Sequence, residues 1–228
     1  MIPLRKVWNQ IQHVVWDWNG TLLDDVDLAV TGVNQVCARF GVPAVTREFY
    51  RARFQFPISA FYSSLGFDLE RIPFSDIIRE YLAVFDARVR HCALNEGALE
   101  LLECLRENGI GSSILSASYR PTLVQTLEAK RLSGYFTHVC GLGDEKGTSK
   151  LEEGHLLHAK LGLPGERILY VGDTTHDAEV AAALGWNSCI LSCGHQDEDR
   201  LGACDSPRMT GIPALFEDLP WGRVVPNR

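Results

Sequence analysis

Short apolar runs alternate with longer helical patterns along most of this chain of 228 residues, and polar residues follow most of the runs. Apolar runs this short have the length of buried strands, whereas the stretches between the later ones are long enough for helices. Strands that alternate with helices are typical of βαβ units built around a parallel sheet. The strands expected from the pattern are His13–Trp16, Gly111–Leu115, Thr137–Cys140, Ile168–Val171 and Ser188–Leu191.

The helices expected between the later strands end at glycines. Gly109, Gly162 and Gly185 stand where three of these helices should stop, as glycines after helix C-termini often do. The sequence therefore predicts an α/β fold, a Rossmann-like parallel sheet with helices on both faces. The expected helices are Gly97–Asn108, Pro121–Arg131, Lys150–Leu161 and His176–Leu184.

The segment 25–95 departs from this alternation, because it contains no convincing strand and several amphipathic helical patterns, including Val26–Phe40 and Ser75–Val89. It carries eight acidic residues and eight arginines but no lysine, so it is neutral while the rest of the chain is acidic. Arginine suits phosphate or carboxylate binding, although arginines also occur on solvated helix faces. We expect a helical cap domain at 25–95 inserted into a core formed by 1–24 and 96–228.

The composition excludes several classes of protein. A formal net charge of −7 is unlike that of a nucleic-acid-binding surface. No apolar run approaches the roughly 18 residues that span a bilayer, and the first residues do not read as a signal peptide. The seven cysteines are scattered without a Cys-x-x-Cys pair, which predicts reduced thiols. We expect a cytoplasmic protein without nucleic-acid or membrane partners, and the sequence leaves its oligomeric state open.

The first expected strand ends in a carboxylate. Asp17 follows the run Val14–Trp16, and the chain then passes through Asn19 and Gly20. Ligands of open α/β sheets bind at the carboxyl ends of the strands, so Asp17 is placed to act as a nucleophile. Asn-Gly is also a common hairpin turn, but no matching alternating strand follows it.

Hydroxyl groups and a lysine follow the next two strands. Ser116 ends a buried strand, and its hydroxyl could bond a phosphoryl oxygen, whereas Ser118 could instead cap the next helix. Lys150 stands at the head of a helix, where the macrodipole disfavours a cation unless an anionic ligand is present. Lys146 is the alternative lysine.

The fourth motif places Asp173 and Asp177 four residues apart at a strand-to-helix turn. Two hard oxygen ligands at such a turn suit Mg²⁺, which binds through one or two carboxylates and keeps several waters. A helix cap at Asp173 or Thr175 would explain one of the two acids but not both.

These motifs in this order, with a helical insertion after the first strand, resemble the haloacid dehalogenase superfamily. The helical-cap branch with phosphoglycolate-phosphatase-like hydrolases is most similar, and the resemblance runs from Val14 to about Leu219. It implies a Mg²⁺-dependent phosphatase acting on a small phosphorylated metabolite.

The resemblance also implies roles for individual residues. Asp17 would attack phosphorus and become an aspartyl phosphate. Ser116 and Lys150 would hold the phosphoryl oxygens, and Thr21 would steady the nucleophile by hydrogen bonding. The expected Mg²⁺ ligands are the carboxylates of Asp17 and Asp173, the backbone carbonyl of Asn19, and Asp177 directly or through water.

Position 19 departs from the family pattern, because most of these phosphatases have a second Asp there that protonates the leaving oxygen. Asn19 cannot exchange a proton, and such catalysis is worth about 10²–10⁴-fold. The substrate could have a good leaving group, as in an acyl phosphate or anhydride, or His176 or His195 could serve as the acid. Two further interpretations are that Asn19 deamidates spontaneously and so acquires the missing carboxylate, or that it is an engineered substitution.

The sequence leaves two other functions open. A catalytically weakened phosphate-binding or regulatory module would need no general acid. A C–halogen hydrolase would need no Mg²⁺ site, whereas the Asp173/Asp177 pair is intact. For specificity, the sequence points to the cap segment 51–57, which mixes Arg51 and Arg53 with aromatic residues.

Overall fold

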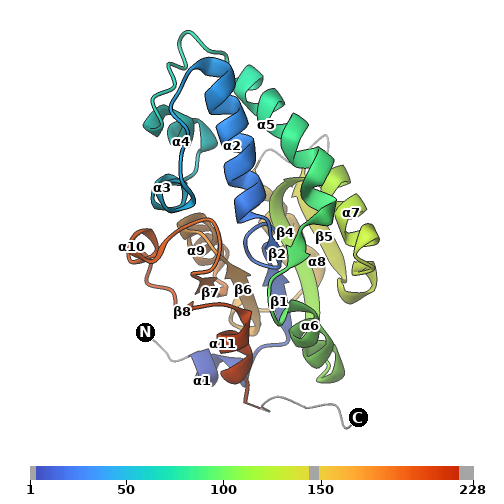
Figure 1. Cartoon of the computed structure of the whole chain (residues 1–228). Helices are drawn as coiled ribbons and strands as arrows, with labels where there is room; N and C mark the ends of the chain where they lie inside the picture. The colour runs from blue at the N-terminus through green and yellow to red at the C-terminus, as the bar shows by residue number, and fades with distance from the viewer. Residues whose placement is uncertain (1–3, 144–148, 221–228) are drawn as a thin grey trace.

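The computed structural model describes residues 4–143 and 149–220, and its core is a six-stranded sheet in which every neighbouring pair of strands is parallel. The strand order is β5-β4-β1-β6-β7-β8 (Figure 1). The chain runs from β1 outward to β5, returns beside β1 as β6, and then continues outward to β8. β1 therefore lies at the point where the strand order reverses, which is where open α/β sheets bind ligands. The strands are β1 His13–Trp16, β4 Gly111–Tyr119, β5 His138–Leu142, β6 Ile168–Gly172, β7 Asn187–Leu191 and β8 Arg208–Met209.

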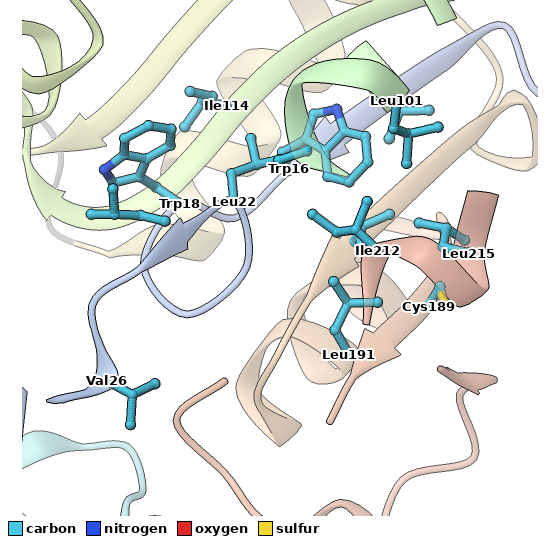
Figure 2. Close-up of a cluster of buried hydrophobic side chains, with 14 of the residues drawn as sticks. Trp16, Trp18, Leu22, Val26, Leu101, Ile114, Cys189, Leu191, Ile212 and Leu215 are labelled. Carbon is cyan, nitrogen blue, oxygen red and sulfur yellow. The ribbon is translucent and has the colours of Figure 1, made fainter. Parts of the chain in front are cut away.

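Helices cover both faces of the sheet, as predicted. Along β1, Val14 and Trp16 belong to one buried cluster and Val15 to another, because successive side chains point to opposite faces. Figure 2 shows Trp16 on one face with Leu101 and Ile212. Helices α8 and α9 cover the other face. The core helices are α1 Leu4–Trp8, α6 Ala98–Glu107, α7 Arg120–Ala129, α8 Lys150–Leu161, α9 Thr175–Leu184, α10 Glu198–Leu201 and α11 Ile212–Glu217.

Four helices form the cap above the carboxyl ends of the strands (Figure 1). Helices α2 and α5 lie side by side, and a Cβ atom on Gly32 of α2 would come within 2.9 Å of the Tyr81 ring. The small residue thus permits the two helices to approach closely. The cap helices are α2 Val26–Phe40, α3 Arg47–Arg53, α4 Ile58–Ser64 and α5 Phe74–Arg88.

A short antiparallel ribbon joins the cap to the core. It pairs β2 (Leu23–Asp24) with β3 (Ala93–Leu94). The expectation of no strand within 25–95 is therefore wrong at β3, since a two-residue strand has no periodicity to detect. Asn19 and Gly20 form no β-hairpin, as the lack of a following alternating strand indicates, because β2 pairs with β3 rather than with β1.

The expected helix ends are confirmed. Gly162 and Gly185 end α8 and α9 in the left-handed region, with φ of 61° and 68°. Strand β4 is longer than expected and continues to Tyr119. Within the described residues there is no disulfide, and no helix has the length and apolar character to cross a membrane.

Candidate active site

Asp17 lies at the carboxyl end of β1, between the ends of β4 and β6. Its backbone N–H donates to the Val171 carbonyl at 2.8 Å, which continues the pairing of β1 with β6 beyond the strand. The residue is 7% exposed. The sheet therefore places this carboxylate at the strand-order reversal and keeps it largely shielded from solvent.

Lys150 joins two of the predicted carboxylates. Its Nζ lies 2.9 Å from Asp17 Oδ1 and 2.6 Å from Asp177 Oδ1, and its side chain is 3% exposed. It is the first residue of α8, after the N-cap Ser149, whose hydroxyl accepts from the Glu152 N–H. The two carboxylates explain a buried cation at a helix N-terminus. The alternative, Lys146, lies outside the described residues.

The loop after β6 brings Asp173 and Asp177 to the same place. Oxygen atoms of Asp17, Asp173 and Asp177 lie within 4.8 Å of one another, and all three residues are buried. Asp177 also completes a capping box on α9: its Oδ2 accepts from the Thr174 N–H and hydroxyl. The N-cap is Thr174, so the alternative of a helix cap at Asp173 or Thr175 does not apply.

Burial and charge shift the protonation of this cluster. Burial raises the pKa of Asp17 to about 7, with Lys150 opposing the shift, and burial raises the pKa of Asp173 to about 6. Burial opposes the charged form of Asp177 too, but Lys150 and Thr174 outweigh it and lower the pKa of that carboxyl. Asp177 is therefore the carboxylate of this cluster that Lys150 and Thr174 keep ionised most readily.

Asn19 is held by the carboxylate of Asp25, a residue to which no sequence motif assigns a role. Its Nδ2 donates to Asp25 Oδ2 at 2.7 Å, and its Oδ1 accepts from the Ser118 hydroxyl. Asp25 is 1% exposed and also accepts from the Gly20 N–H at 2.7 Å. Gly20 has φ of 70°, and a Cβ there would collide with Asp173 and His195. A buried carboxylate therefore stands beside position 19, but it belongs to Asp25 and accepts hydrogen bonds from Asn19 and Gly20.

His195 belongs to the same group, whereas His176 does not. The backbone N–H of His195 donates to Asp173 Oδ2 at 2.6 Å, the ring Nδ1 lies 2.9 Å from the Tyr50 hydroxyl, and the ring Nε2 lies 3.6 Å from Asp25 Oδ1. Burial alone would lower the pKa of His195, but Asp25 and Asp173 outweigh it and raise the pKa to about 9. The His176 ring instead packs on Phe56.

Two predicted roles take a different form. The Thr21 hydroxyl donates to Asp173 Oδ1 at 2.9 Å, so Thr21 orients Asp173 rather than the nucleophile. Ser116 is 1% exposed and lines the cavity beside Asp17, with its Oγ accepting from the Ser118 N–H. Ser118 does not cap α7, whose N-cap is Tyr119. Tyr170, which no motif indicated, donates to Asp177 Oδ1 at 3.1 Å from within β6.

A cavity of about 400 Å³ extends from these residues into the cap. Phe54, Phe56 and Phe61 line it. Arg51 does not line it. Its guanidinium donates instead to the backbone carbonyls of Ser192, Gly194 and Gln196, at 2.5, 2.7 and 2.9 Å. The exposed Arg53 stacks on the Phe49 ring, so both arginines of the segment 51–57 lie outside the cavity.

Comparisons with known proteins agree with this arrangement. The family of haloacid dehalogenase-like hydrolases matches residues 14–191. The probable phosphatase IndB of Dickeya dadantii is 28% identical over 198 residues, which cover 84% of this chain and 86% of that protein. A phosphoglycolate phosphatase of Nitrosospira multiformis is 25% identical over 215 residues, covering 91% and 93% of the two chains.

The fold matches solved structures of the same type. A haloacid dehalogenase-like hydrolase of Streptococcus pneumoniae superposes with a TM-score of 0.78 at 18% identity, covering 91% of this chain and 98% of the other. Since the family match covers more than three quarters of the sequence and includes the motifs that carry Asp17, Ser116, Lys150 and Asp173, the chain belongs to the haloacid dehalogenase-like hydrolases, with a helical cap inserted between β1 and β4.

Proposed function

We propose that this protein is a Mg²⁺-dependent phosphatase that hydrolyses a small phosphorylated metabolite through an aspartyl phosphate on Asp17. The observation that carries the proposal is the buried Asp17 carboxylate, held 2.9 Å from Lys150 at the strand-order reversal. The names of the related phosphatases support the reaction class.

The residues present fit a divalent cation. Four buried carboxylates, Asp17, Asp25, Asp173 and Asp177, face two buried cationic side chains, Lys150 and His195. When all four carboxylates are ionised, their surplus of two negative charges matches one divalent ion, and carboxylate oxygens are the ligands that Mg²⁺ prefers. Asp17 and Asp173 would hold it, together with the Asn19 carbonyl, and Asp177 would bind directly or through water. When bound, the ion would neutralise charge on the phosphoryl oxygens that face Asp17.

The side chains around Asp17 divide the remaining work. An Asp17 oxygen forms a bond to phosphorus as the bond to the leaving oxygen breaks, and water later cleaves the aspartyl phosphate. Lys150 and the Ser116 hydroxyl hold the phosphoryl oxygens. Asn19 can donate a hydrogen bond to the leaving oxygen but no proton, so good leaving groups are favoured.

The test measures phosphate release from acetyl phosphate with and without Mg²⁺. Wild-type protein and an Asp27→Asn control, which changes an exposed carboxylate on α2, should both turn over, whereas Asp17→Asn should not. Borohydride reduction and mass spectrometry should locate the phosphoryl group at Asp17. Phosphate binding without turnover of any phosphate ester or anhydride would instead indicate a regulatory module, and halide release from a haloacid would indicate C–halogen hydrolysis.

A further inference from the structure

The cavity above Asp17 is walled largely by aromatic side chains of the cap. Rings from α3 to α5 and the segments between them line it, and three of them, Tyr50, Phe61 and Tyr62, are at most 2% exposed. Phe54 packs edge-to-face on Phe61, with ring centroids 5.5 Å apart, so the wall is continuous. A volume of about 400 Å³ lies within the range of small-molecule sites.

The charges of this cavity are concentrated at its floor. Among the described residues that line it, the cationic side chains are Lys150 and His195, which lie beside Asp17 and Asp25. On the cap side, the charged side chain is Asp86 of α5, an exposed carboxylate at the rim. The floor can therefore hold a phosphoryl group, but the walls formed by the described residues offer no cation to an anion, and Asp86 would repel one.

Asn19 limits the leaving oxygen in a second, independent way. Its amide is fixed between Asp25 and Ser118 and cannot protonate an alkoxide. A phenolate leaves far more readily without a proton, since a phenol such as that of tyrosine ionises with a pKa of about 10. An aromatic leaving group can pack against the ring-lined walls, and it can depart as a phenolate without being protonated.

We infer that the substrate is an aryl phosphate monoester whose ring carries no negative charge, an inference that rests on the proposed phosphatase function. The phosphorus–oxygen bond to the ring breaks, its electron pair stays on the phenolate oxygen, and the Asp17–phosphorus bond forms. Water then attacks phosphorus and restores the Asp17 carboxylate. One proton of that water remains on the released phosphate and the other reaches the phenolate through solvent, so the products are a phenol and hydrogen phosphate.

The decisive comparison uses 4-methylphenyl phosphate and 4-carboxyphenyl phosphate with the Mg²⁺-loaded protein. The two esters have the same ring, and the carboxylate makes the second phenolate the better leaving group. We nevertheless expect kcat/KM for the methyl ester to be higher by about 100-fold, because the carboxylate must enter apolar walls beside Asp86. Equal values, or a preference for the carboxyl ester, would overturn the inference.

Two further esters separate the contributions of ring and leaving group. Benzyl phosphate has the ring but an alkoxide leaving group, and we expect it to react at least 100-fold more slowly than 4-methylphenyl phosphate. Acetyl phosphate has a good leaving group but no ring, and it tests the proposed function alone. Turnover of acetyl phosphate without any preference for the uncharged aryl ester would overturn this inference and leave the phosphatase function standing.

If neither the esters nor acetyl phosphate were hydrolysed, the phosphatase function would fail. Calorimetry would then measure how tightly the cavity binds each aryl ester. Tighter binding of 4-methylphenyl phosphate than of 4-carboxyphenyl phosphate would support the ligand class, and equal affinities would overturn it.

A matched pair of variants tests the walls directly. Leu82→Arg adds a cation to the cavity wall and offsets Asp86, whereas Leu99→Arg adds one to a similarly exposed leucine on α6 that does not line the cavity. Leu82→Arg should lower the ratio of kcat/KM for the methyl ester to kcat/KM for the carboxyl ester about 10-fold, and Leu99→Arg should leave this ratio unchanged. The same preference in both variants would contradict the assignment of these walls to the leaving group.

Discussion

The Asn19 amide donates to the Asp25 carboxylate across 2.7 Å, so the two residues form a complementary pair in which the carboxyl group stands at position 25. Replacing only Asn19 by Asp would therefore bring two carboxylates together in a buried site. We expect Asn19→Asp to lower the free energy of unfolding by about 2 kcal/mol at neutral pH, since a partly buried hydrogen bond becomes a repulsion. Urea unfolding measures this change.

Exchanging both residues should restore the hydrogen bond with its polarity reversed. We expect the double variant Asn19→Asp/Asp25→Asn to regain stability and to hydrolyse benzyl phosphate about 100-fold faster than wild type, because a general acid then stands at position 19. A single variant as stable and active as the double one would show that Asp25 does not oppose an acid at position 19.

Lys150 supports the site as well as the reaction. Lys150→Met leaves the buried carboxylates of Asp17 and Asp177 without their shared cation, which costs about 3–5 kcal/mol of unfolding free energy. Turnover should be lost as well. Lys160→Met, an exposed change in the last turn of the same helix, should affect neither quantity. Equal stability of the two variants would mean that the ion pair contributes nothing to folding.

Magnesium should stabilise the folded protein without any substrate. At a free concentration 100 times the dissociation constant, we expect a gain of about 2.7 kcal/mol, which thermal unfolding with Mg²⁺ or with a chelator can detect. Asp173→Asn should abolish most of the gain, because this residue is a predicted ligand. The control Asp27→Asn should keep it, and a gain retained in Asp173→Asn would place the ion elsewhere.

His13 gives the protein a dependence on acid that is separate from the active site. Burial, with a smaller contribution from His138, lowers the pKa of His13 to about 4, and its Nε2 lies 2.9 Å from the Ser113 hydroxyl. The unfolded chain takes up this proton near pH 6.5. Stability from His13 is therefore complete above that pH and is lost as the pH falls towards 4, by about 3 kcal/mol.

The variant His13→Gln should unfold with a weaker pH dependence than wild type between pH 6.5 and 4. The exposed His155→Gln should behave as wild type does. Parallel pH curves for wild type and His13→Gln would show that His13 titrates normally in the folded state.

Sequence patterns predicted the regular strands and helices of this protein and the motifs that follow the strands. Buried strands such as Ile168–Gly172 and helices that end at Gly162 or Gly185 carry local signals, and so do the motifs with Asp17 and Asp173. Short strands such as Leu23–Asp24 carry none, because two residues have no period.

The side-chain partnerships were not predictable in the same way. The Tyr50 hydroxyl meets His195 across 145 positions of sequence, and Asp25 meets Asn19 only because the chain folds back between them. The arginines of the segment 51–57 misled the specificity prediction for the same reason. A guanidinium has the same sequence signal whether it faces a ligand or, as Arg51 does, three carbonyl groups of a neighbouring loop.

The Arg51 contacts have a consequence for how substrate reaches Asp17. They fasten the α3 side of the cap to the loop that carries His195, and Arg200 of α10 adds bonds to the Ala52 carbonyl and the Gln55 side chain. Beyond the end of α5, Lys130, the residue after α7, donates to the backbone carbonyls of Arg90 and Cys92. These bonds and the β2–β3 ribbon hold the cap to the core at both places. We expect molecules to reach Asp17 past the exposed Asp86 of α5, whose carboxylate would repel anionic rings before they reach the phosphoryl site.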